Sequence, residues 1–223
     1  YITKSKKSMK DDVVKGEDGI FYSPKEVIIA YNEGKLDLHA QIKVKTYDLN
    51  HLGEPELKLI ETSCGRVIFN EKVPQEVGYI NDVLTKKALR DIIGKVLKVC
   101  GTSRTALFLD EIKGLGYTMA FKGGLSFNLD DIIIPKEKET LVNKAEGQVR
   151  EVMDNYNMGL ITNNERYNQI IDIWTHTNSR LTHTLMDQLK TDRQGFNSIY
   201  MMFDSGARGS KEQIRQLSGM RGL

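Results

Sequence analysis

Apolar and polar residues alternate between residues 38 and 47, which is the pattern of a half-buried β-strand. The apolar side chains on one face of this strand are Ala40, Ile42 and Val44. A cluster of turn-forming residues, His51–Pro55, follows it, and the apolar run Gly65–Phe69 predicts a second strand. We therefore expect a β-hairpin in the first part of the chain.

Three other segments of the first half have the spacing of amphipathic helices. They lie between residues 24 and 33, between 83 and 97, and between 108 and 119. Their expected boundaries are Ser23-Pro24 and Gly34 for the first helix, Gly101 for the end of the second, and Gly123-Gly124 for the end of the third. Leu125–Ile134 is short and strand-like, and Pro135 follows it. We expect a mixed α and β domain over residues 1–135.

The pattern changes after Pro135, where two long amphipathic helices are predicted at about residues 137–190. Gly159 interrupts the first, and Thr162 with Glu165 matches the capping box that begins the second. Two helices joined by so few residues form an antiparallel hairpin. The expected seam residues are Leu141, Ala145, Val149, Val152 and Tyr156 on the first helix and Tyr167, Ile171, Trp174, Leu181, Leu185 and Leu189 on the second.

A short helical part completes the predicted second domain, residues 136–223. Residues 196–203 predict an apolar, methionine-rich helix, residues 204–210 a glycine- and serine-rich turn, and Lys211 the restart of a helix. The predicted fold class is therefore α+β. A small mixed α/β domain is followed by a long antiparallel helical hairpin and a short helical C-terminal part that spans about residues 196–223.

Composition narrows the class of protein. Hydrophobic residues make up 39% of the chain and charged residues 28%, which is typical of a folded globular domain. No apolar run approaches the roughly 18 residues of a membrane helix, and the first residues lack the apolar core of a secretion signal. We therefore expect a cytoplasmic protein with no membrane partner. Because the chain begins at Tyr1 rather than Met and ends at Leu223 with no obvious stop, it is expected to be a piece of a longer protein.

Charge is unevenly distributed in the second domain. Residues 136–192 carry seven Lys or Arg and nine Asp or Glu side chains, so their net charge is 7 − 9 = −2. Residues 193–223 carry five basic and two acidic side chains, so their net charge is 5 − 2 = +3. A basic C-terminal end therefore follows an acidic segment.

Most residues with catalytic or metal-binding chemistry are scattered. Cys64 and Cys100 are too few for a four-thiolate zinc site and are expected to be reduced thiols. His176 and His183 lie two helical turns apart, too far to share a zinc ion, and His39 and His51 lie elsewhere. No phosphate-binding P-loop or nucleophile elbow is present. The adjacent carboxylates are expected to be solvated or to cap turns: Asp11-Asp12, Asp110-Glu111 and Asp130-Asp131.

The turn from Gly206 to Ser210 is the best candidate for chemistry. Its two glycines let a ligand approach the backbone closely, and Ser210 opens a helix N-terminus, which favours anions. Arg208 adds a planar fork that suits phosphate. These residues also fit a helix-breaking turn with a capping serine and a structural arginine, which the pattern alone favours while leaving the phosphate site open.

Two stretches of the chain closely resemble the β′ subunit of bacterial RNA polymerase. The longer runs from Phe196 through the turn to Leu223, and the other spans Gly159–Trp174 with its Glu165-Arg166-Tyr167-Asn168 motif. Weaker matches lie upstream, at Leu38-His39-Ala40, Gly65-Arg66-Val67-Ile68 and Asp130–Pro135. The resemblance therefore extends over essentially the whole chain.

This resemblance implies a middle part of β′ that contains the pore and funnel regions. These line the secondary channel, through which nucleoside triphosphates enter. Arg208 matches an arginine that contacts the incoming triphosphate, and the neighbouring channel lining is expected to comprise Asp204, Ser205, Gly206, Gly209, Ser210, Lys211 and Gln213. Transcript-cleavage and DksA-type factors are expected to dock on the hairpin at Glu165, Arg166, Asn168 and Asp172.

The same resemblance implies the partners and cofactors of the whole enzyme. The full DNA-directed RNA polymerase, a nucleotidyltransferase (EC 2.7.7.6), acts on DNA and RNA in the nucleoid together with the α, β, ω and σ subunits. Its β′ subunit holds Mg²⁺ and Zn²⁺, but the Asn-Ala-Asp-Phe-Asp-Gly-Asp loop and the zinc cysteines do not occur in this sequence. No residue of the chain is therefore expected to be catalytic or to bind a metal, and the chain alone should be inactive. The alternative hypothesis is a free-standing helical-hairpin interaction module with a basic nucleic-acid-binding end.

Overall fold

A computed structural model describes residues 1–9, 12–50 and 53–221. The chain divides into two compact units, Tyr1–Leu125 and Ser126–Leu223, and the division precedes Pro135. The first unit is mixed α and β and the second is helical, so the predicted α+β class is confirmed. No helix among the described residues is both long and apolar enough to cross a membrane.

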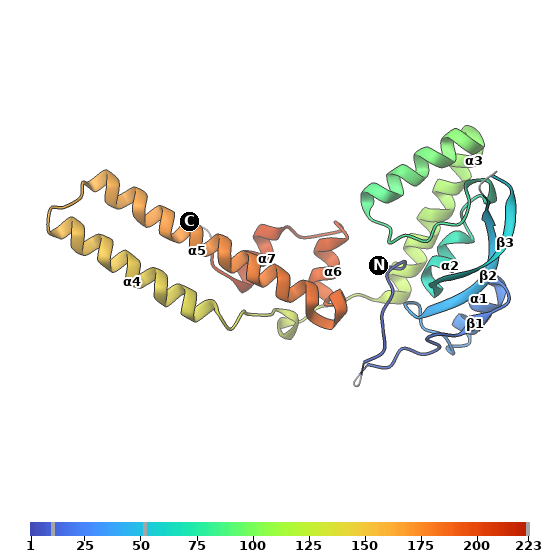
Figure 1. Cartoon of the computed structure of the whole chain (residues 1–223), viewed down its shortest axis with the longest axis horizontal. Helices are drawn as coiled ribbons and strands as arrows, with labels where there is room; N and C mark the ends of the chain where they lie inside the picture. The colour runs from blue at the N-terminus through green and yellow to red at the C-terminus, as the bar shows by residue number, and fades with distance from the viewer. Residues whose placement is uncertain (10–11, 51–52, 222–223) are drawn as a thin grey trace. The chain divides into compact units, whose positions relative to one another are not determined.

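The strands of the first unit form a three-stranded sheet in the order β1 (Ile20–Phe21), β2 (Gln41–Leu49) and β3 (Pro55–Ser63) (Figure 1). β1 is parallel to β2, and β2 pairs with β3 in an antiparallel hairpin from Gln41↔Ser63 to Leu49↔Pro55. A hairpin is therefore present at the predicted turn, but its second strand is Pro55–Ser63 rather than the predicted Gly65–Phe69. His51 and Leu52 of the turn lie outside the described residues. The inward residues of β2, Ile42 and Val44, are almost fully buried, as their alternation predicts.

Helix α1 (Pro24–Asn32) covers this core together with α2 (Cys64–Asn70). The Ser23 side chain accepts a hydrogen bond from the Glu26 N–H at 3.3 Å, which confirms the predicted N-cap. The core around them comprises Val14, Val27, Leu36, Ala40, Ile42, Val44, Cys64, Val67 and Ile68.

The prediction of a strand at Gly65–Phe69 is wrong, because these residues lie in α2. Ser63 ends β3 and caps α2, accepting from the Arg66 N–H at 3.3 Å. A Cβ added to Gly65 would lie 1.8 Å from the carbonyl oxygen of Ile2, so only glycine fits at this position. Burial of Val67, Ile68 and Phe69 on a helix overrides their preference for strands.

Helix α3 (Lys86–Gly123) is interrupted at Gly101, which has φ +76° and ψ 178°. This break separates the two helices that the sequence predicts on either side of Gly101. Val96 and Phe108, one from each part, are buried in a second core with Phe69 and Val77. The segment η1 (Gln75–Val77) is a short 3₁₀-helix beside it.

The second unit begins with an irregular segment. The strand predicted at Leu125–Ile134 is wrong, because the structure places the 3₁₀-helix η2 (Leu129–Asp131) there and no strand among these residues. Asn128 and Asp131 form a reciprocal capping box, with the Asn128 N–H donating to Asp131 Oδ2 at 3.0 Å. The tendency of these two side chains to bond nearby backbone groups favours a turn over a strand.

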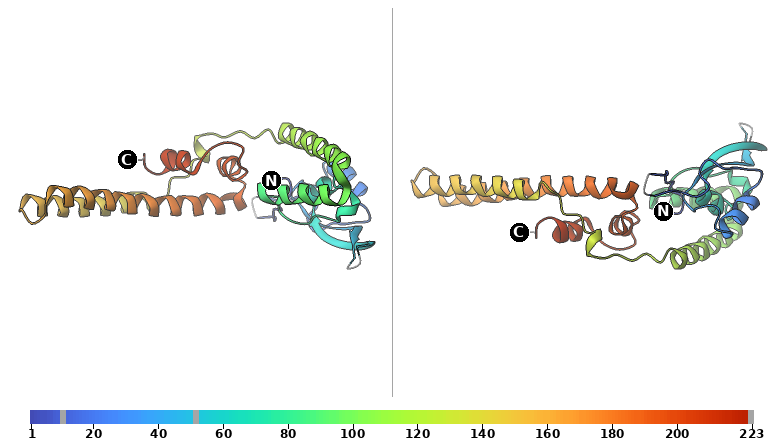
Figure 2. Two further views of the ribbon diagram at one scale, coloured as in Figure 1. Left: turned by 90° about the horizontal axis from the view of Figure 1, so that it is seen from above. Right: turned by 90° about the horizontal axis from the view of Figure 1, so that it is seen from below.

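Helices α4 (Lys138–Asn157) and α5 (Asn163–Thr191) form the predicted antiparallel hairpin; they run side by side in Figure 1 and overlap in Figure 2, where the hairpin is seen edge-on. The buried seam residues include Ala145 and Val152 on α4. Tyr167, predicted to lie in the seam, is instead 62% exposed, and Trp174 is half-buried. The chain continues through η3 (Asp192–Gly195), α6 (Ser198–Asp204) and α7 (Lys211–Ser218), which pack on α5.

The two cysteines should differ sharply in reactivity. Cys64 is fully buried, and burial raises the pKa of its thiol to about 12, whereas Cys100 is only half-buried. A thiol reagent reacts with the thiolate. Native protein treated with iodoacetamide at neutral pH should therefore be modified at Cys100 and protected at Cys64, as mapped by peptide mass spectrometry. A Cys100→Ser variant is the control, and rapid labelling of Cys64 in folded protein would contradict the burial of α2.

Candidate functional site

The tip of the helical hairpin is closed by a capping box. Gly159 adopts φ +76° after α4, and Thr162 caps α5. Glu165 Oε2 accepts from the Thr162 N–H at 2.7 Å and from its hydroxyl at 2.9 Å, and Thr162 Oγ1 accepts from the Glu165 N–H at 3.3 Å. These hydrogen bonds lower the pKa of the Glu165 carboxyl. Glu165 is thus exposed but already engaged in fixing the tip.

Arg166 crosses from α5 to α4 within the tip. Its guanidinium carbon lies 4.8 Å from the centre of the Tyr156 ring, and its Nη2 donates to Asn163 Oδ1 at 2.8 Å. Nη1 lies 4.0 Å from Met153 Sδ, and Nε is buried without a partner among the described residues. Of the four hairpin residues predicted to dock regulators, Arg166 is therefore turned inward, while Asn168 and Asp172 are exposed on α5.

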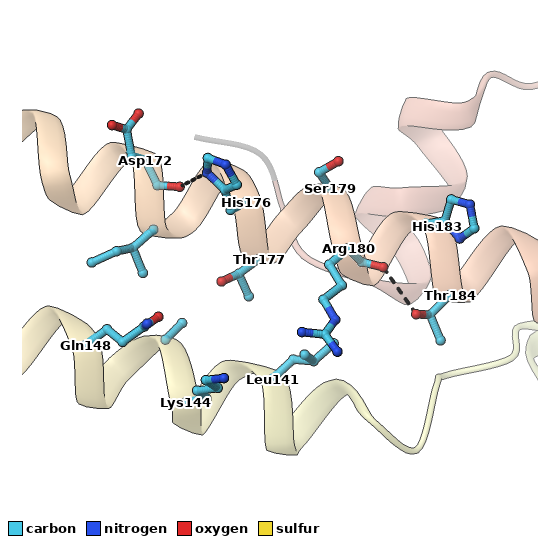
Figure 3. Close-up of a pocket in the computed structure, with 12 residues that line it drawn as sticks. Leu141, Lys144, Gln148, Asp172, His176, Thr177, Ser179, Arg180, His183 and Thr184 are labelled. Carbon is cyan, nitrogen blue, oxygen red and sulfur yellow. Dashed lines mark hydrogen bonds between the residues drawn. The ribbon is translucent and has the colours of Figure 1, made fainter.

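An open groove of about 880 Å³ lies between α4 and α5, nearer the middle of the hairpin (Figure 3). Leu141, Lys144, Ala145 and Gln148 line it from α4. Arg180, Thr177 and Thr184 extend from α5 toward α4, whereas Asp172, His176 and His183 lie along the other edge of α5. His176 Nδ1 is 2.9 Å from the Asp172 carbonyl oxygen, and His183 Nδ1 is 2.8 Å from Asp187 Oδ2.

The base of the hairpin is tied to the rest of the unit by Asn197. Its side chain is buried; Nδ2 donates to the Asp131 carbonyl at 3.1 Å and to Asp192 Oδ2 at 3.0 Å. Oδ1 accepts from the N–H groups of Ile199 and Tyr200, so Asn197 also caps α6. The buried Asp131 carboxylate pairs with Arg193 Nη1 at 3.3 Å.

The segment between α5 and α6 holds unusual backbone angles. Arg193 has φ +46°, Gln194 +59° and Gly195 +79°, so three consecutive residues occupy the left-handed region. Non-glycine residues persist there only where surrounding contacts hold them. The contacts that Arg193 and Asn197 make with Asp131 supply that restraint.

The turn from Asp204 to Ser210 is exposed and held by short-range hydrogen bonds. Gly206 and Gly209 have φ +72° and +95°, and a Cβ at either would meet no atom within 4 Å. These glycines therefore serve the chain reversal and leave the backbone open. The Gly206 N–H donates to the Phe203 carbonyl at 3.0 Å, and the Arg208 N–H to the Met202 carbonyl at 3.3 Å.

The N-terminus of α7 is capped by its own side chains. Ser210 Oγ accepts from the Gln213 N–H at 3.2 Å, and Gln213 Oε1 accepts from the Ser210 N–H at 2.9 Å. Ser210 and Gln213 are therefore occupied as a capping box. The Arg208 and Lys211 side chains are exposed and form no hydrogen bond or ion pair among the described residues, so they are free to meet an anion.

The sequence does not indicate which arginines form structural contacts and which do not. Arg166, Arg193 and Arg215 are committed to structural contacts, the last in an ion pair with Glu212, while Arg180 and Arg208 are not. Nothing in the residue type separates the two groups. In the described parts of the chain, no three His, Cys, Asp or Glu side chains lie close enough together to hold a metal ion. Asp11, His51 and the last two residues of the C-terminal motif lie outside those parts.

Two family models match the chain. The model described as RNA polymerase Rpb1, domain 3, matches residues 1–132, and the model described as RNA polymerase Rpb1, domain 4, matches residues 161–223. The first match covers the whole mixed α and β unit and the first residues of the second unit, and the second match includes α5, α6, α7 and the turn.

Curated relatives align with the whole chain. The DNA-directed RNA polymerase subunit β′ of Bacteroides fragilis is 65% identical over 223 residues, which is 100% of this chain and 15% of that protein. The subunits β′ of Porphyromonas cangingivalis and Flavobacterium psychrophilum are 62% and 58% identical over the same span, covering 19% and 16% of their lengths. The chain thus spans less than a fifth of the length of these relatives.

Replacing Arg166 should loosen the hairpin tip. An Arg166→Lys change retains the charge but cannot both stack on Tyr156 and bond Asn163, because the ammonium lacks the planar fork. Loss of an exposed cation–π contact is worth about 0.5–1 kcal/mol. Hydrogen exchange of tip amides around residues 156–166 should accelerate about two- to fivefold, the factor that this energy gives. The control is Arg150→Lys, an exposed α4 arginine paired only with Glu146 at 3.8 Å. Equal exchange in both variants would contradict a structural role for Arg166.

Proposed function

Because this chain belongs to the RNA polymerase β′ family, we propose that it forms part of the secondary channel of bacterial DNA-directed RNA polymerase. In this proposal the turn and α7 line the route of nucleoside triphosphates, and Arg208 contacts their phosphates. The remaining channel lining is Asp204, Ser205, Gly206, Gly209, Ser210, Lys211 and Gln213. The helical hairpin docks regulators that act through the channel.

The observation that carries the proposal is the exposed Arg208 side chain, which has no partner among the residues that the structure describes, on a turn whose backbone is held by hydrogen bonds. The two flanking glycines leave its backbone open, and the capping box fixes the start of α7 beside it. An exposed guanidinium without a partner gives up no protein hydrogen bond when it meets phosphate oxygens, which it can bind with two parallel hydrogen bonds. Lys211 adds a second exposed cation one helical position beyond the cap.

The chain contributes binding rather than bond-making in this proposal. A β′ subunit that makes RNA from nucleoside triphosphates needs Mg²⁺ at its reacting phosphates, and Zn²⁺ is the other metal that the family implies. The described residues offer no cluster of ligands for either ion, so we assign no metal step to this chain. The residues of this chain orient the triphosphate through their positive charge. The other polymerase subunits, together with DNA and RNA, complete the enzyme.

The hairpin is proposed to meet transcript-cleavage or DksA-type factors through its exposed polar residues. Asn168 and Asp172 lie on α5 four residues apart, so their side chains share one face of the helix. Glu165 is exposed but serves the capping box, and Arg166 shapes the tip from within. Direct contact is therefore assigned to Asn168 and Asp172, with Glu165 and Arg166 holding the surface that presents them.

Arg208 should govern the use of all four nucleotides alike, since phosphate carries no base identity. A charge-assisted hydrogen bond contributes roughly 1.5–3 kcal/mol, so Arg208→Ala in the assembled polymerase should weaken nucleotide use about 10- to 150-fold. Arg208→Lys should recover only part of the loss. The measurement is the nucleotide concentration that half-saturates single-nucleotide addition, with Arg221→Ala as the matched control. Unchanged saturation would assign Arg208 to the shape of the turn alone.

A substitution at Asp172 should change the binding of a regulator without changing the stability of the hairpin tip. Asp172→Arg reverses an exposed charge that takes no part in the capping box, so the hairpin should keep its melting temperature while affinity for a Gre-type or DksA-type factor falls about tenfold or more. Binding of the labelled factor to assembled polymerase is the measurement. Asp154→Arg, at another exposed carboxylate of the hairpin, is the control. If Asp172→Arg bound the factor as well as Asp154→Arg does, the docking assignment would fail.

A further inference from the structure

The groove between α4 and α5 has a chemistry that the proposed function leaves unused. Its floor is apolar and shallow, formed by Leu141, Ala145 and Ile173. Two cations border this floor, Lys144 from α4 and Arg180 from α5, and the Arg180 side chain extends across the gap toward Leu141 of α4 (Figure 3). An apolar floor with flanking charge is the form of a surface that accepts an amphipathic helix.

The two flanking cations have no anionic partner within the described chain. Neither Lys144 nor Arg180 forms an ion pair there, although the hairpin contains other pairs, Arg150 with Glu146 and His183 with Asp187. The only carboxylate that lines the groove is Asp172, on the far edge of α5. The imidazoles of His176 and His183 also border the groove. The local charge of the groove is thus positive on a hairpin whose total charge is negative.

The contrast between the positive groove and the negative hairpin indicates which class of ligand the groove can bind. Residues 136–192 carry a net charge of 7 − 9 = −2, which disfavours a long polyanion such as RNA along the hairpin. A short acidic surface that also offers apolar side chains would gain from both the floor and the two cations. The α5 lining extends from Asp172 to Thr184, which at 1.5 Å per residue spans about 18 Å, or roughly three helical turns.

We propose that this groove binds an acidic amphipathic helix of a partner protein, packed as a third helix against α4 and α5. Apolar residues of the partner at positions i, i+3 or i+4, and i+7 fill the floor, and its flanking carboxylates pair with Lys144 and Arg180. The proposal rests on the proposed function in one respect: a hairpin that docks regulators is where such a helix would be found. It adds the chemical class of the docking element and a position on the hairpin.

The test uses the 223-residue chain and labelled peptides, with binding read by fluorescence anisotropy. The probe is a helical peptide of about 18 residues with leucines at helical spacing and flanking glutamates. One control peptide has glutamine at every glutamate position, and an oligouridylate serves as competitor. We expect the acidic peptide to bind at least about tenfold more tightly than the glutamine peptide, with affinity falling as salt rises. Oligouridylate should not displace it.

Charge-removing variants locate the site. The double change Lys144→Gln and Arg180→Gln should weaken binding of the acidic peptide about tenfold or more and leave the glutamine peptide unaffected. Arg150→Gln, on α4 outside the groove, should change affinity less than about twofold. Circular dichroism melting verifies that each variant folds.

The proposal is overturned if neither peptide binds, if the groove variants bind as the parent does, or if oligouridylate displaces the peptide, which would indicate a nucleic-acid surface. Regulator binding to assembled polymerase carrying Asn168→Arg is scored separately, because Asn168 is a proposed docking residue that is exposed on α5 and does not line the groove. Failure of the peptide test with intact dependence on Asn168 would leave the proposed function standing and remove only the acidic-helix assignment.

Discussion

The second unit depends on one buried side chain, the carboxamide of Asn197. Its donors bond Asp131 and Asp192 while its acceptor caps α6, so one residue joins the segment before the hairpin, the end of α5 and the start of the next helix. A buried amide left without partners is strongly destabilising. The hydrogen bonds of the Asn197 side chain are therefore expected to form together or be lost together. The left-handed backbone at Arg193 and Gln194 persists because Asn197 and Asp131 hold both of its ends.

The junction around Asn197 determines which helices the apolar side chains of α5 pack against. Leu185 and Leu189 pack with Tyr200 and Ile214 of α6 and α7, and Leu181 lies 3.6 Å from the Cβ that would be added at Gly219. Leu185 and Leu189 of α5 are therefore buried against the C-terminal helices. Opposite α4, α5 presents smaller or polar residues such as Thr177 and Thr184, and Ala145 stands on the α4 side. The hairpin is consequently incompletely filled on one side, and the groove is the result.

Arginines divide into two physical classes in this unit, and the division underlies both proposals. Arg166, Arg193 and Arg215 are fixed by a ring, a buried carboxylate and a neighbouring glutamate, respectively. Arg180 and Arg208 are held by the backbone alone, and their guanidinium groups lack anionic partners among the described residues. Arginines with protein partners stabilise the fold, whereas Arg180 and Arg208 remain available to a ligand.

Elements whose signals are local could be predicted from the order of residues alone. The caps at Ser23, Thr162 and Ser210, the break at Gly101 and the alternation of Ile42 and Val44 all follow from hydrogen bonding or periodicity within a few residues. The long motif around Arg208 likewise indicates the family from the residue pattern alone. Tertiary structure alone decided that Gly65–Phe69 is helical, because the Ile2 backbone contacts Gly65 and three apolar side chains are buried together. It also decided which arginines are engaged, since a contact such as that between Arg193 and Asp131 joins residues far apart in sequence and leaves no periodic trace along the chain.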